Sequence, residues 1–466
     1  MNSVIEIANS VRSGERLAVD VVEHFFNEIN LKNESVNAFV YLDKSGALSA
    51  AKVIDERVAQ GKDPGLLAGV PFGVKDLQHC AGMPSTYGSV FFQDAELSQN
   101  DDEFVRRLRA AGAIPVGMVA TAEFGMDSAT NTALWGATLN PWNLERTPGG
   151  SSGGSSAAVS SGMVPFCTAG DSAGSTRSPA GFTGTVGMLA THGRVPNDGG
   201  FEGFTGNGVI TKSVKDWARL LDVMTGPYLG DRASLPLPNV NYESSCDSLD
   251  VEGLKVLWSD DYGYAVVEDE VVQVARKAAD KLIESAKLIP VNREFCPPNA
   301  VKHWMTESLE RVKVGLGIMG VLPDKSEHLS PGIRSLLKEF DEWDISREDV
   351  YQAHKLLPTI ESSVAELFND VDILITPTTA CVAYGAEQSM PKIIDGKDAC
   401  DTRAEPFGFL ANACWLPSIS VPAGVTSEGL PVGLQITCKR HRDDLVLRLA
   451  RILECTQPWP LLAPGY

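Results

Sequence analysis

Amphipathic helical segments alternate with short apolar segments in both halves of this chain, and this alternation constrains its fold more than any other feature. Residues 14–31 repeat apolar side chains at three- and four-residue spacings, as a helix with one buried face does, and residues 36–42 then predict a strand. Similar signals follow at 47–60, 69–77, 102–119, 371–379, 418–424 and 443–455. Such a chain buries its strands between helices, so we expect an α/β fold whose sheet is covered by helices on both faces.

Residues 230–345 interrupt the alternation, because they are less regular and richer in proline, lysine and glutamate. We expect a mainly helical insert there, which includes Trp304 and Met305. Two interpretations stay open: the insert caps a substrate pocket, or it is a surface excursion with a small core of its own. Strand signals on both sides of residues 149–161 favour a single domain over residues 1–466, and a separate domain over residues 1–148 is the alternative.

The composition restricts the kinds of partner that we expect the chain to bind. The chain has 40 basic and 60 acidic residues, a net charge of −20, which opposes binding to nucleic acid or to an anionic membrane. Its first residues lack the apolar core of a signal peptide, and no run of eighteen apolar residues predicts a membrane span. The nine cysteines are scattered and form no CxxC pair, which argues against a zinc site or a disulfide framework. We therefore expect a cytoplasmic protein without a metal, and a homodimer stays open.

The segment GGSSGGSSAAVSS at 149–161 has the composition of a flexible linker, but its surroundings favour another interpretation. It leads into apolar residues 157–159, where we expect a helix, and a Gly/Ser turn before a helix leaves backbone N–H groups free to bind an oxyanion. A strand signal and a second small-residue turn follow in MVPFCTAGDSAGSTRSPAGFTG at 163–184. Both turns lie downstream of a lone lysine, Lys75, in the apolar segment at 69–77.

Lys75 admits two interpretations. A lysine in an apolar segment often extends its ammonium group into solvent. If the side chain is buried instead, desolvation lowers its pKa, and a neutral amine at neutral pH can act as a general base. A lysine combined with a serine is a known replacement for the serine–histidine pair of hydrolases. The second interpretation would join Lys75 to the serines of the two turns.

These blocks resemble those of the amidase signature family. The resemblance covers GVPFGVKD, GGSSGGSSAAV and GDSAGSTRSPAGFTGTVG, and it continues through NPWN at 140–143, ITPTT, and SISVPAGVTSEGLPVGLQI at 418–436. It therefore extends over nearly the whole chain, in order. It implies the fold of that family, a large twisted mixed β-sheet covered by helices on both faces. It implies no cofactor.

The resemblance also assigns roles. The nucleophile would be Ser175, the relay Ser151 after a cis peptide bond, and the base Lys75. It further implies an oxyanion hole of N–H groups from Ser172, Ala173, Gly174 and Ser175, supporting roles for Ser152, Asp171 and Arg177, and substrate contacts from Gly125, Met126 and Ser178. The sequence departs from the common family pattern at Gly170 and Ala173, where threonine and glycine are frequent. Alanine is small enough to leave the oxyanion hole open.

The implied activity is hydrolysis of a carbonyl–nitrogen bond in a small amide, anilide or carbamate, with ester cleavage as a side activity, through an acyl-serine intermediate. One alternative is the glutaminase subunit of a tRNA-dependent amidotransferase, which members of the same family provide. A second is an α/β-hydrolase-type esterase, because GDSAG at 170–174 fits the GxSxG motif with Ser172 as nucleophile. That elbow should open a helix, whereas Pro179 and Gly181 follow closely. His192, 17 residues after Ser175, could be a base or a hydrogen-bonding loop residue.

Overall fold

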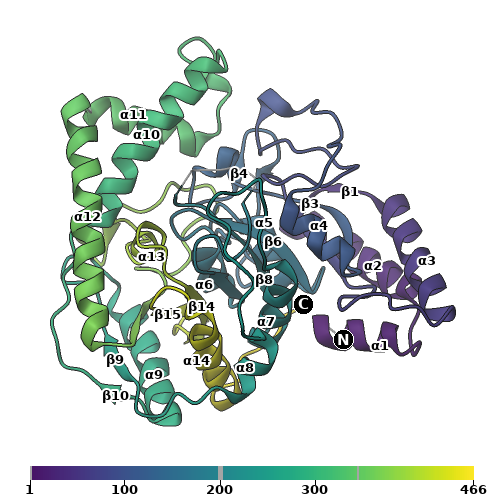
Figure 1. Cartoon of the computed structure of the whole chain (residues 1–466). Helices are drawn as coiled ribbons and strands as arrows, with labels where there is room; N and C mark the ends of the chain where they lie inside the picture. Colours follow the sequence, from purple (N-terminus) through teal and green to yellow (C-terminus); the bar gives the residue numbers. More distant parts are fainter. Residues whose placement is uncertain (1–2, 198–202, 344–345) are drawn as a thin grey trace.

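The computed structural model describes residues 3–197, 203–343 and 346–466, and within these ranges eleven strands form one large sheet (Figure 1). Their spatial order is β1-β3-β2-β6-β8-β7-β14-β15-β11-β9-β10. Neighbours are parallel in β3-β2-β6 and in β11-β9-β10 and antiparallel elsewhere, so the sheet is mixed. The strands are β1 Phe39–Leu42, β2 Pro71–Lys75, β3 Ile114–Val119, β6 Phe166–Asp171, β7 Val186–Leu189, β8 Gly206–Thr211, β9 Lys255–Trp258, β10 Ile289–Pro290, β11 Ile373–Pro377, β14 Ser418–Val425 and β15 Pro431–Cys438. Two small hairpins lie outside the sheet, β4 Asn131–Thr132 with β5 Gly136–Ala137 and β12 Ile393–Ile394 with β13 Lys397–Asp398.

Helices surround the sheet in Figure 1, and the chain ends lie near each other beside α1. The helices are α1 Val4–Arg12, α2 Ala18–Val36, α3 Lys44–Ala59, α4 Glu103–Ala110, α5 Gly153–Ser160, α6 Arg177–Thr183, α7 Val214–Met224, α8 Tyr242–Ser248, α9 Asp269–Ala286, α10 Ala300–Ile318, α11 Pro331–Trp343, α12 Arg347–Asp370, α13 Gly408–Ala413 and α14 Asp443–Thr456. The described part contains no helix that combines the length and apolarity needed to cross a membrane.

Strand β14 shows that both faces of the sheet are covered. Successive side chains of a strand point to opposite faces. Ser418 and Ser420 lie against α6, whereas Ile419 and Val421 belong to the large hydrophobic core that also contains the buried side chains of α9 and α14. The predicted α/β fold with helices on both faces is therefore confirmed.

The predicted elements recur with shifted boundaries. The helix expected at 14–31 is α2, which begins only at Ala18, so Leu17 precedes it in an extended conformation and is exposed. The first N–H groups of α2 donate instead to the Asp55 carboxylate of α3, from Ala18 at 2.6 Å and Val19 at 3.1 Å. The strand and helix signals between residues 36 and 119 correspond to β1, α3, β2, α4 and β3.

Residues 230–345 do not form one helical unit. Strand β9 pairs in parallel with β11 and β10 with β9, so this part of the segment extends the main sheet. Helices α10 and α11 stand together with α12 at one side of the molecule, away from α1–α3 (Figure 1). They attach to the body through a hydrophobic cluster in which Met126 meets Leu316, Val321, Leu329, Ile333 and Leu337.

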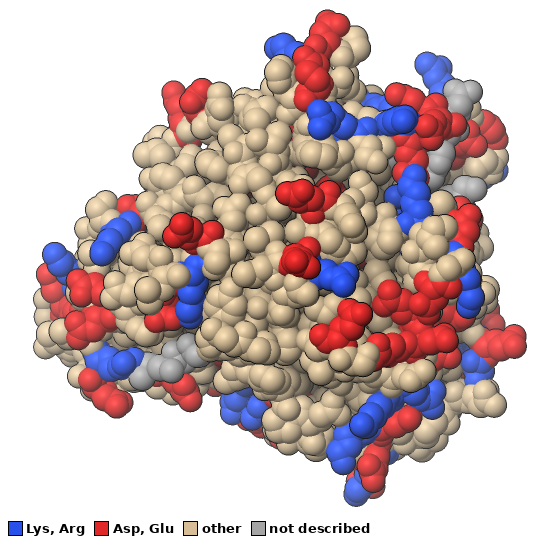
Figure 2. Space-filling model, turned by 180° about the vertical axis from the view of Figure 1, so that it is seen from behind, with Lys and Arg blue, Asp and Glu red and all other residues tan. Residues whose placement is uncertain are grey.

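Figure 2 shows the side of the molecule opposite to Figure 1. Acidic side chains gather toward its lower right, and basic side chains lie mostly near its edges.

Candidate active site

Lys75, the last residue of β2, lies in the interior with 1% of its surface exposed. Its Nζ is 2.8 Å from Ser151 Oγ and 2.7 Å from Ser152 Oγ, and 3.4 Å from the carbonyl oxygen of Gly170. A lysine that extends into solvent is therefore excluded, and the amine is held by two hydroxyl groups.

Burial governs the charge of this amine. Desolvation lowers the pKa of Lys75 to about 7, although the Asp171 carboxylate favours the charged form. At neutral pH the Lys75 amine is thus uncharged in a large fraction of the molecules and can accept a proton.

The Gly-Ser segment is not a linker, because every residue from 149 to 161 is buried. The Gly150–Ser151 peptide bond is cis, and α5 starts at Gly153, so part of the segment is itself helical. The Ser151 carbonyl oxygen accepts from the Ala122 N–H at 3.1 Å and from Thr121 Oγ1 at 3.0 Å. Glycine is required for this close packing: a Cβ on Gly154 would lie 2.4 Å from the Ala120 carbonyl oxygen.

The second small-residue turn, residues 172–176, joins β6 to α6 and is organised by the buried Asp171. The Asp171 carboxylate accepts from the Gly174 N–H at 2.7 Å and from Arg177 Nη2 at 2.9 Å and Nε at 3.0 Å. Burial opposes the charged carboxylate, but Arg177 and these hydrogen bonds outweigh it, so the pKa of Asp171 lies below its usual value. Arg177 is fully buried and also donates to Asn412 Oδ1 and Gln435 Oε1.

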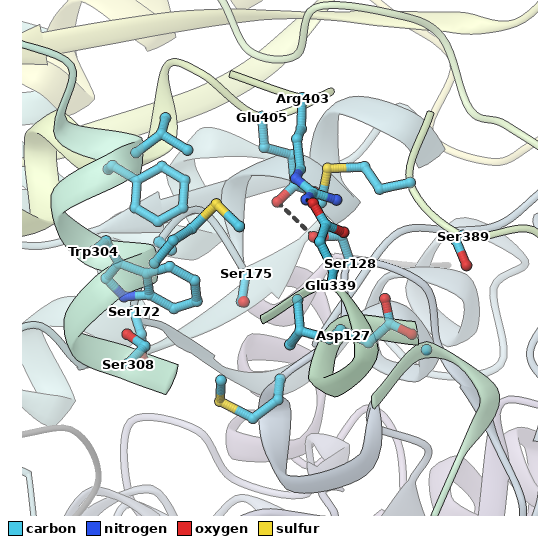
Figure 3. A pocket seen from close by; sticks show the side chains of 18 of the residues that line it. Asp127, Ser128, Ser172, Ser175, Trp304, Ser308, Glu339, Ser389, Arg403 and Glu405 are labelled. Atoms are coloured by element: carbon cyan, nitrogen blue, oxygen red, sulfur yellow. Dashed lines mark hydrogen bonds and ion pairs between the residues drawn. The ribbon is translucent and has the colours of Figure 1, made fainter. Parts of the chain in front are cut away.

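Two cavities meet at these turns. Ser175, Ser172 and Ala173 line the first, together with Gly125 and Met126 (Figure 3). The second cavity is lined by Lys75 and Ser151, and it shares Ser172 and Gly125 with the first.

The two serines of the predicted relay lie on adjoining segments, because the Ser152 N–H donates to the Ser175 carbonyl oxygen at 3.2 Å. Within the described ranges, the Ser151 hydroxyl bonds to Lys75 and not directly to Ser175. Catalytic hydrogen bonds are often long before a substrate is bound.

Of the four N–H groups predicted for an oxyanion hole, that of Gly174 already has a partner inside the protein. The Gly174 N–H carries a single hydrogen, which points to Asp171. The backbone N–H groups of Ser172, Ala173 and Ser175 remain candidates for binding a substrate oxygen.

The predicted substrate contacts separate into two groups. Gly125 and Met126 line the first cavity, and Met126 is at the same time part of a hydrophobic cluster. Ser178 does not line it: it is buried on α6, close enough to Glu405 to favour the charged form of that carboxyl group.

The esterase arrangement is not assembled. The Ser172 hydroxyl pairs with Thr205 Oγ1 at 2.7 Å, and α6 begins five residues further on, at Arg177. His192 stacks on Trp415 with ring centroids 4.4 Å apart, and burial lowers its pKa. Neither contact supplies the serine–histidine pair that the GxSxG motif requires.

Several cavity residues are not found from the sequence. They come from α10, α11 and the segment 389–409, and they include Val301, Met305, Leu336, Glu339, Arg403, Glu405 and Phe409. The sequence shows Trp304 and Met305 only as large apolar residues in an irregular segment. None of the others stands in a local motif, so only the tertiary structure reveals their position. Among the described residues, His, Cys, Asp and Glu form no group of three or more that could hold a metal ion.

The chain is similar to known proteins over almost its full length. Residues 20–447 match the family model described as Amidase. The chain is 32% identical over 474 residues to an acylamidase from Rhodococcus erythropolis, covering 98% of this chain and 96% of that protein. It is 32% identical over 490 residues to a glutamyl-tRNA(Gln) amidotransferase subunit from Salinispora tropica, covering 97% and 96%. Among solved structures, a bacterial aryl acylamidase belonging to the amidase signature enzymes is similar with a TM-score of 0.90 and 26% identity, covering 98% of this chain and 96% of that one.

Proposed function

The chain belongs to the amidase signature family and is a hydrolase acting on C–N bonds, and from this premise we propose that it cleaves small neutral amides, anilides or carbamates through an acyl-serine intermediate on Ser175. Ser151 is the proton relay and Lys75 the base. The observation that carries this proposal is the buried Lys75 amine, 2.8 Å from Ser151 Oγ on the segment next to Ser175.

The proton path follows from this contact. Neutral Lys75 accepts the Ser151 proton while Ser151 accepts that of Ser175, so the Ser175 oxygen attacks the substrate carbonyl. A serine suits the middle position, because its hydroxyl donates and accepts at once. Ser152 is the second hydroxyl on the amine and holds it toward Ser151.

The oxyanion of the tetrahedral intermediate binds to N–H groups of the turn 172–175. Asp171 and Arg177 support this turn, because the carboxylate fixes the Gly174 and Thr176 N–H groups and the guanidinium neutralises the carboxylate. Losing one oxyanion donor typically costs about 2.7–4 kcal/mol of transition-state stabilisation.

The two cavities hold different parts of the substrate. Protonation of the leaving nitrogen comes from Ser151, so the amine part points into the second cavity, which Lys75 and Ser151 line. The acyl part then occupies the first cavity, beside Ser175. Gln78 supports the assignment of the amine side: it lines the second cavity, and within the described residues its buried Oε1 accepts no hydrogen bond and so suits an amine N–H. A water molecule then gives a proton through Ser151 to Lys75 and attacks the acyl-serine, and this proton returns through Ser151 to the Ser175 oxygen as the acid departs.

Helices α10 and α11 cap the acyl cavity in this proposal, as part of a single domain. Trp304 and Met305 from α10 and Leu336 from α11 line it. A location in the cytoplasm and a homodimer stay predictions.

The test is turnover by the purified chain alone. Its substrates are an anilide, a primary amide, a carbamate, an ester and free glutamine, with release of amine or ammonia as the measurement. We expect hydrolysis of anilides or simple amides, and mass spectrometry of the quenched reaction should find the acyl group on the peptide that contains Ser175. Glutamine as the single substrate that is cleaved would support the glutaminase of an amidotransferase instead. An acyl group on Ser172 would contradict the proposal.

A further inference from the structure

The acyl cavity changes character along its length. Near Ser175 its wall is apolar, formed by Met126, Val301, Trp304, Met305, Leu336 and Phe409. At the other side lie Asp127, Ser128, Glu339, Arg403 and Glu405, which we call the acidic end (Figure 3). An apolar acyl group would leave the polar atoms of this end that have no protein partner, among them Glu405 Oε1, without a hydrogen bond, which costs free energy in a buried site.

Glu405 is the most deeply constrained member of the acidic end. It is only 6% exposed, and its Oε2 accepts from the Ser128 hydroxyl at 2.9 Å. Within the described residues no group donates to its other oxygen, Oε1, which is fully shielded. Desolvation, together with the Asp171 and Asp127 carboxylates, raises the pKa of Glu405 to about 8, although Ser128 and Ser178 favour its charged form. This carboxyl group thus has an unused acceptor site in a cavity that the substrate enters.

Asp127 lies beside it on the segment that also carries Gly125 and Met126. Its Oδ1 accepts weakly from the Ala129 N–H at 3.3 Å, and desolvation raises its pKa to about 6. The other oxygen, Oδ2, rests against α11, where a Cβ on Gly332 would lie 1.5 Å away. Glycine at 332 therefore leaves the space that the Asp127 carboxylate occupies.

The two cationic side chains that line this end pair with one of its carboxylates, Glu339. Arg403 forms an ion pair with Glu339, and Lys392 Nζ lies 3.1 Å from the other oxygen of Glu339. The described lining thus holds three carboxyl groups, Asp127, Glu339 and Glu405, against two cations. A further cation would favour the charged forms of Glu405 and Asp127, whereas a further anion would meet these carboxyl groups and two cations that are already paired with Glu339.

We propose, on the basis of the proposed function, that the acyl cavity selects acyl groups whose far end carries a primary ammonium, bound by Glu405 and Asp127. An ammonium has three donors and no acceptor. One would satisfy Glu405 Oε1, and Asp127 would take a second. The apolar wall would hold the methylene chain between the amide carbonyl and this ammonium.

Binding tests this selectivity without catalysis. The probes are primary amides of straight-chain ω-amino acids with three to eight carbons, the alkanamides of equal length, and the matching ω-carboxy amides. They are titrated by calorimetry into the Ser175→Ala variant. We expect one ω-amino chain length to bind about 10- to 100-fold more tightly than its alkanamide, the range for a hydrogen bond to a charged group. Two buffers of different ionisation enthalpy should show proton release, because the bound cation favours the charged carboxylates.

Two variants locate the effect. Glu405→Gln and Asp127→Asn keep shape and lose charge, and each should remove most of the preference for the ω-amino probe while alkanamide affinity stays unchanged. Gly332→Ala displaces the Asp127 carboxylate without removing a charge and should weaken the preference in the same direction. The matched control is Glu366→Gln on α12, an exposed carboxylate that does not line the cavity. Thermal denaturation verifies that each variant is folded.

Equal binding of ω-amino probes and alkanamides, or tighter binding of ω-carboxy probes, would overturn this inference. So would an ω-amino preference that persists in both Glu405→Gln and Asp127→Asn. Failure of the proposed function looks different, since the chain would then hydrolyse no amide, anilide or carbamate of any acyl group. The two failures are therefore distinguishable.

Discussion

The two walls of the active site are built in different ways. On one wall the arrangement depends on backbone groups: the carbonyl oxygens that hold the turn and the N–H groups around Asp171. On the other wall α10 and α11 contribute side chains, and the helices attach to the body by apolar packing while Val314 and Ile318 on α10 remain exposed. The backbone conformation of the first wall accepts few residue types, whereas the side chains that line the second wall can be replaced by others. Substitutions in the first wall should therefore alter the chemical step, and those in the second should alter which acyl group is preferred.

The strongest test of this contrast is Ser175→Ala. Removal of the nucleophile should lower kcat by roughly 10⁴- to 10⁶-fold while substrate affinity is retained. Steady-state rates and calorimetric affinity measure the two quantities. A variant that keeps a tenth of the activity would show that Ser175 is not the nucleophile.

Lys75→Met should lower kcat/KM by about 10²- to 10⁴-fold, the usual range for a general base. The pH dependence provides a sharper criterion. The active form is the neutral amine, and burial lowers the pKa of Lys75 to about 7, so activity should fall as the pH drops below 7 and level off above 8. The variant should lack this acidic limb. A limb that is unchanged in Lys75→Met would assign it to another group.

Arg177→Met should affect stability as well as rate. It leaves the buried Asp171 without its counter-ion, and breaking a buried pair costs about 3–5 kcal/mol. Arg177 lowers the pKa of Asp171 in the folded protein, so the pair stabilises the fold above the unfolded pKa of the carboxyl group and less as the pH falls. Without Arg177, burial raises the pKa of Asp171, and protonation of its carboxylate removes the free-energy cost of a buried, unpaired charge. The difference in free energy of unfolding from the wild type should therefore narrow from pH 7 to pH 5 in denaturant titrations.

The sequence was informative where the backbone restricts residue choice. Gly150 and Gly154 accompany Ser151 because a Cβ at either position would lie 2.4 Å from a carbonyl oxygen of the neighbouring segment. Such constraints produce a run of small residues that can be recognised in the sequence alone. For the same reason the turn after β6 was predictable, although the use of the Gly174 N–H by Asp171 was not, since no pattern tells which of four adjacent N–H groups a carboxylate takes.

The residues that line the acyl cavity form no comparable pattern in the sequence. Glu405 and Asp127 stand in ordinary loops, and their significance arises when α11 and two distant segments meet at one cavity. Strand β9 was also missed, because four residues are too short for a periodicity and their pairing with β11 comes from far along the chain. In both cases the deciding contacts are tertiary.

Trp304→Ala tests the side-chain wall. The indole lies over Phe409 with ring centroids 4.8 Å apart and lines the acyl cavity, so its removal widens the cavity. We expect a shift of roughly 10-fold in the ratio of kcat/KM values between a bulky and a short acyl anilide, in favour of the bulky one. The kcat of the better substrate should change little. Trp415→Ala is the control, because this indole is partly exposed and does not line the cavity. A uniform loss of kcat for all acyl groups would place Trp304 with the catalytic wall instead.

The smallest effect is expected at Ser178, a position that connects the two walls. It belongs to α6 of the catalytic wall, yet it lies close to Glu405 and favours the charged form of that carboxyl group. Ser178→Ala should therefore leave the rate with an alkanoyl anilide unchanged and raise KM for an ω-aminoacyl anilide about two- to fivefold, the scale of one weak polar interaction. Because Ser178 does not line the cavity, any effect must pass through Glu405, and it should vanish when Ser178→Ala is combined with Glu405→Gln. Additive losses in the double variant would mean that Ser178 contacts the substrate itself.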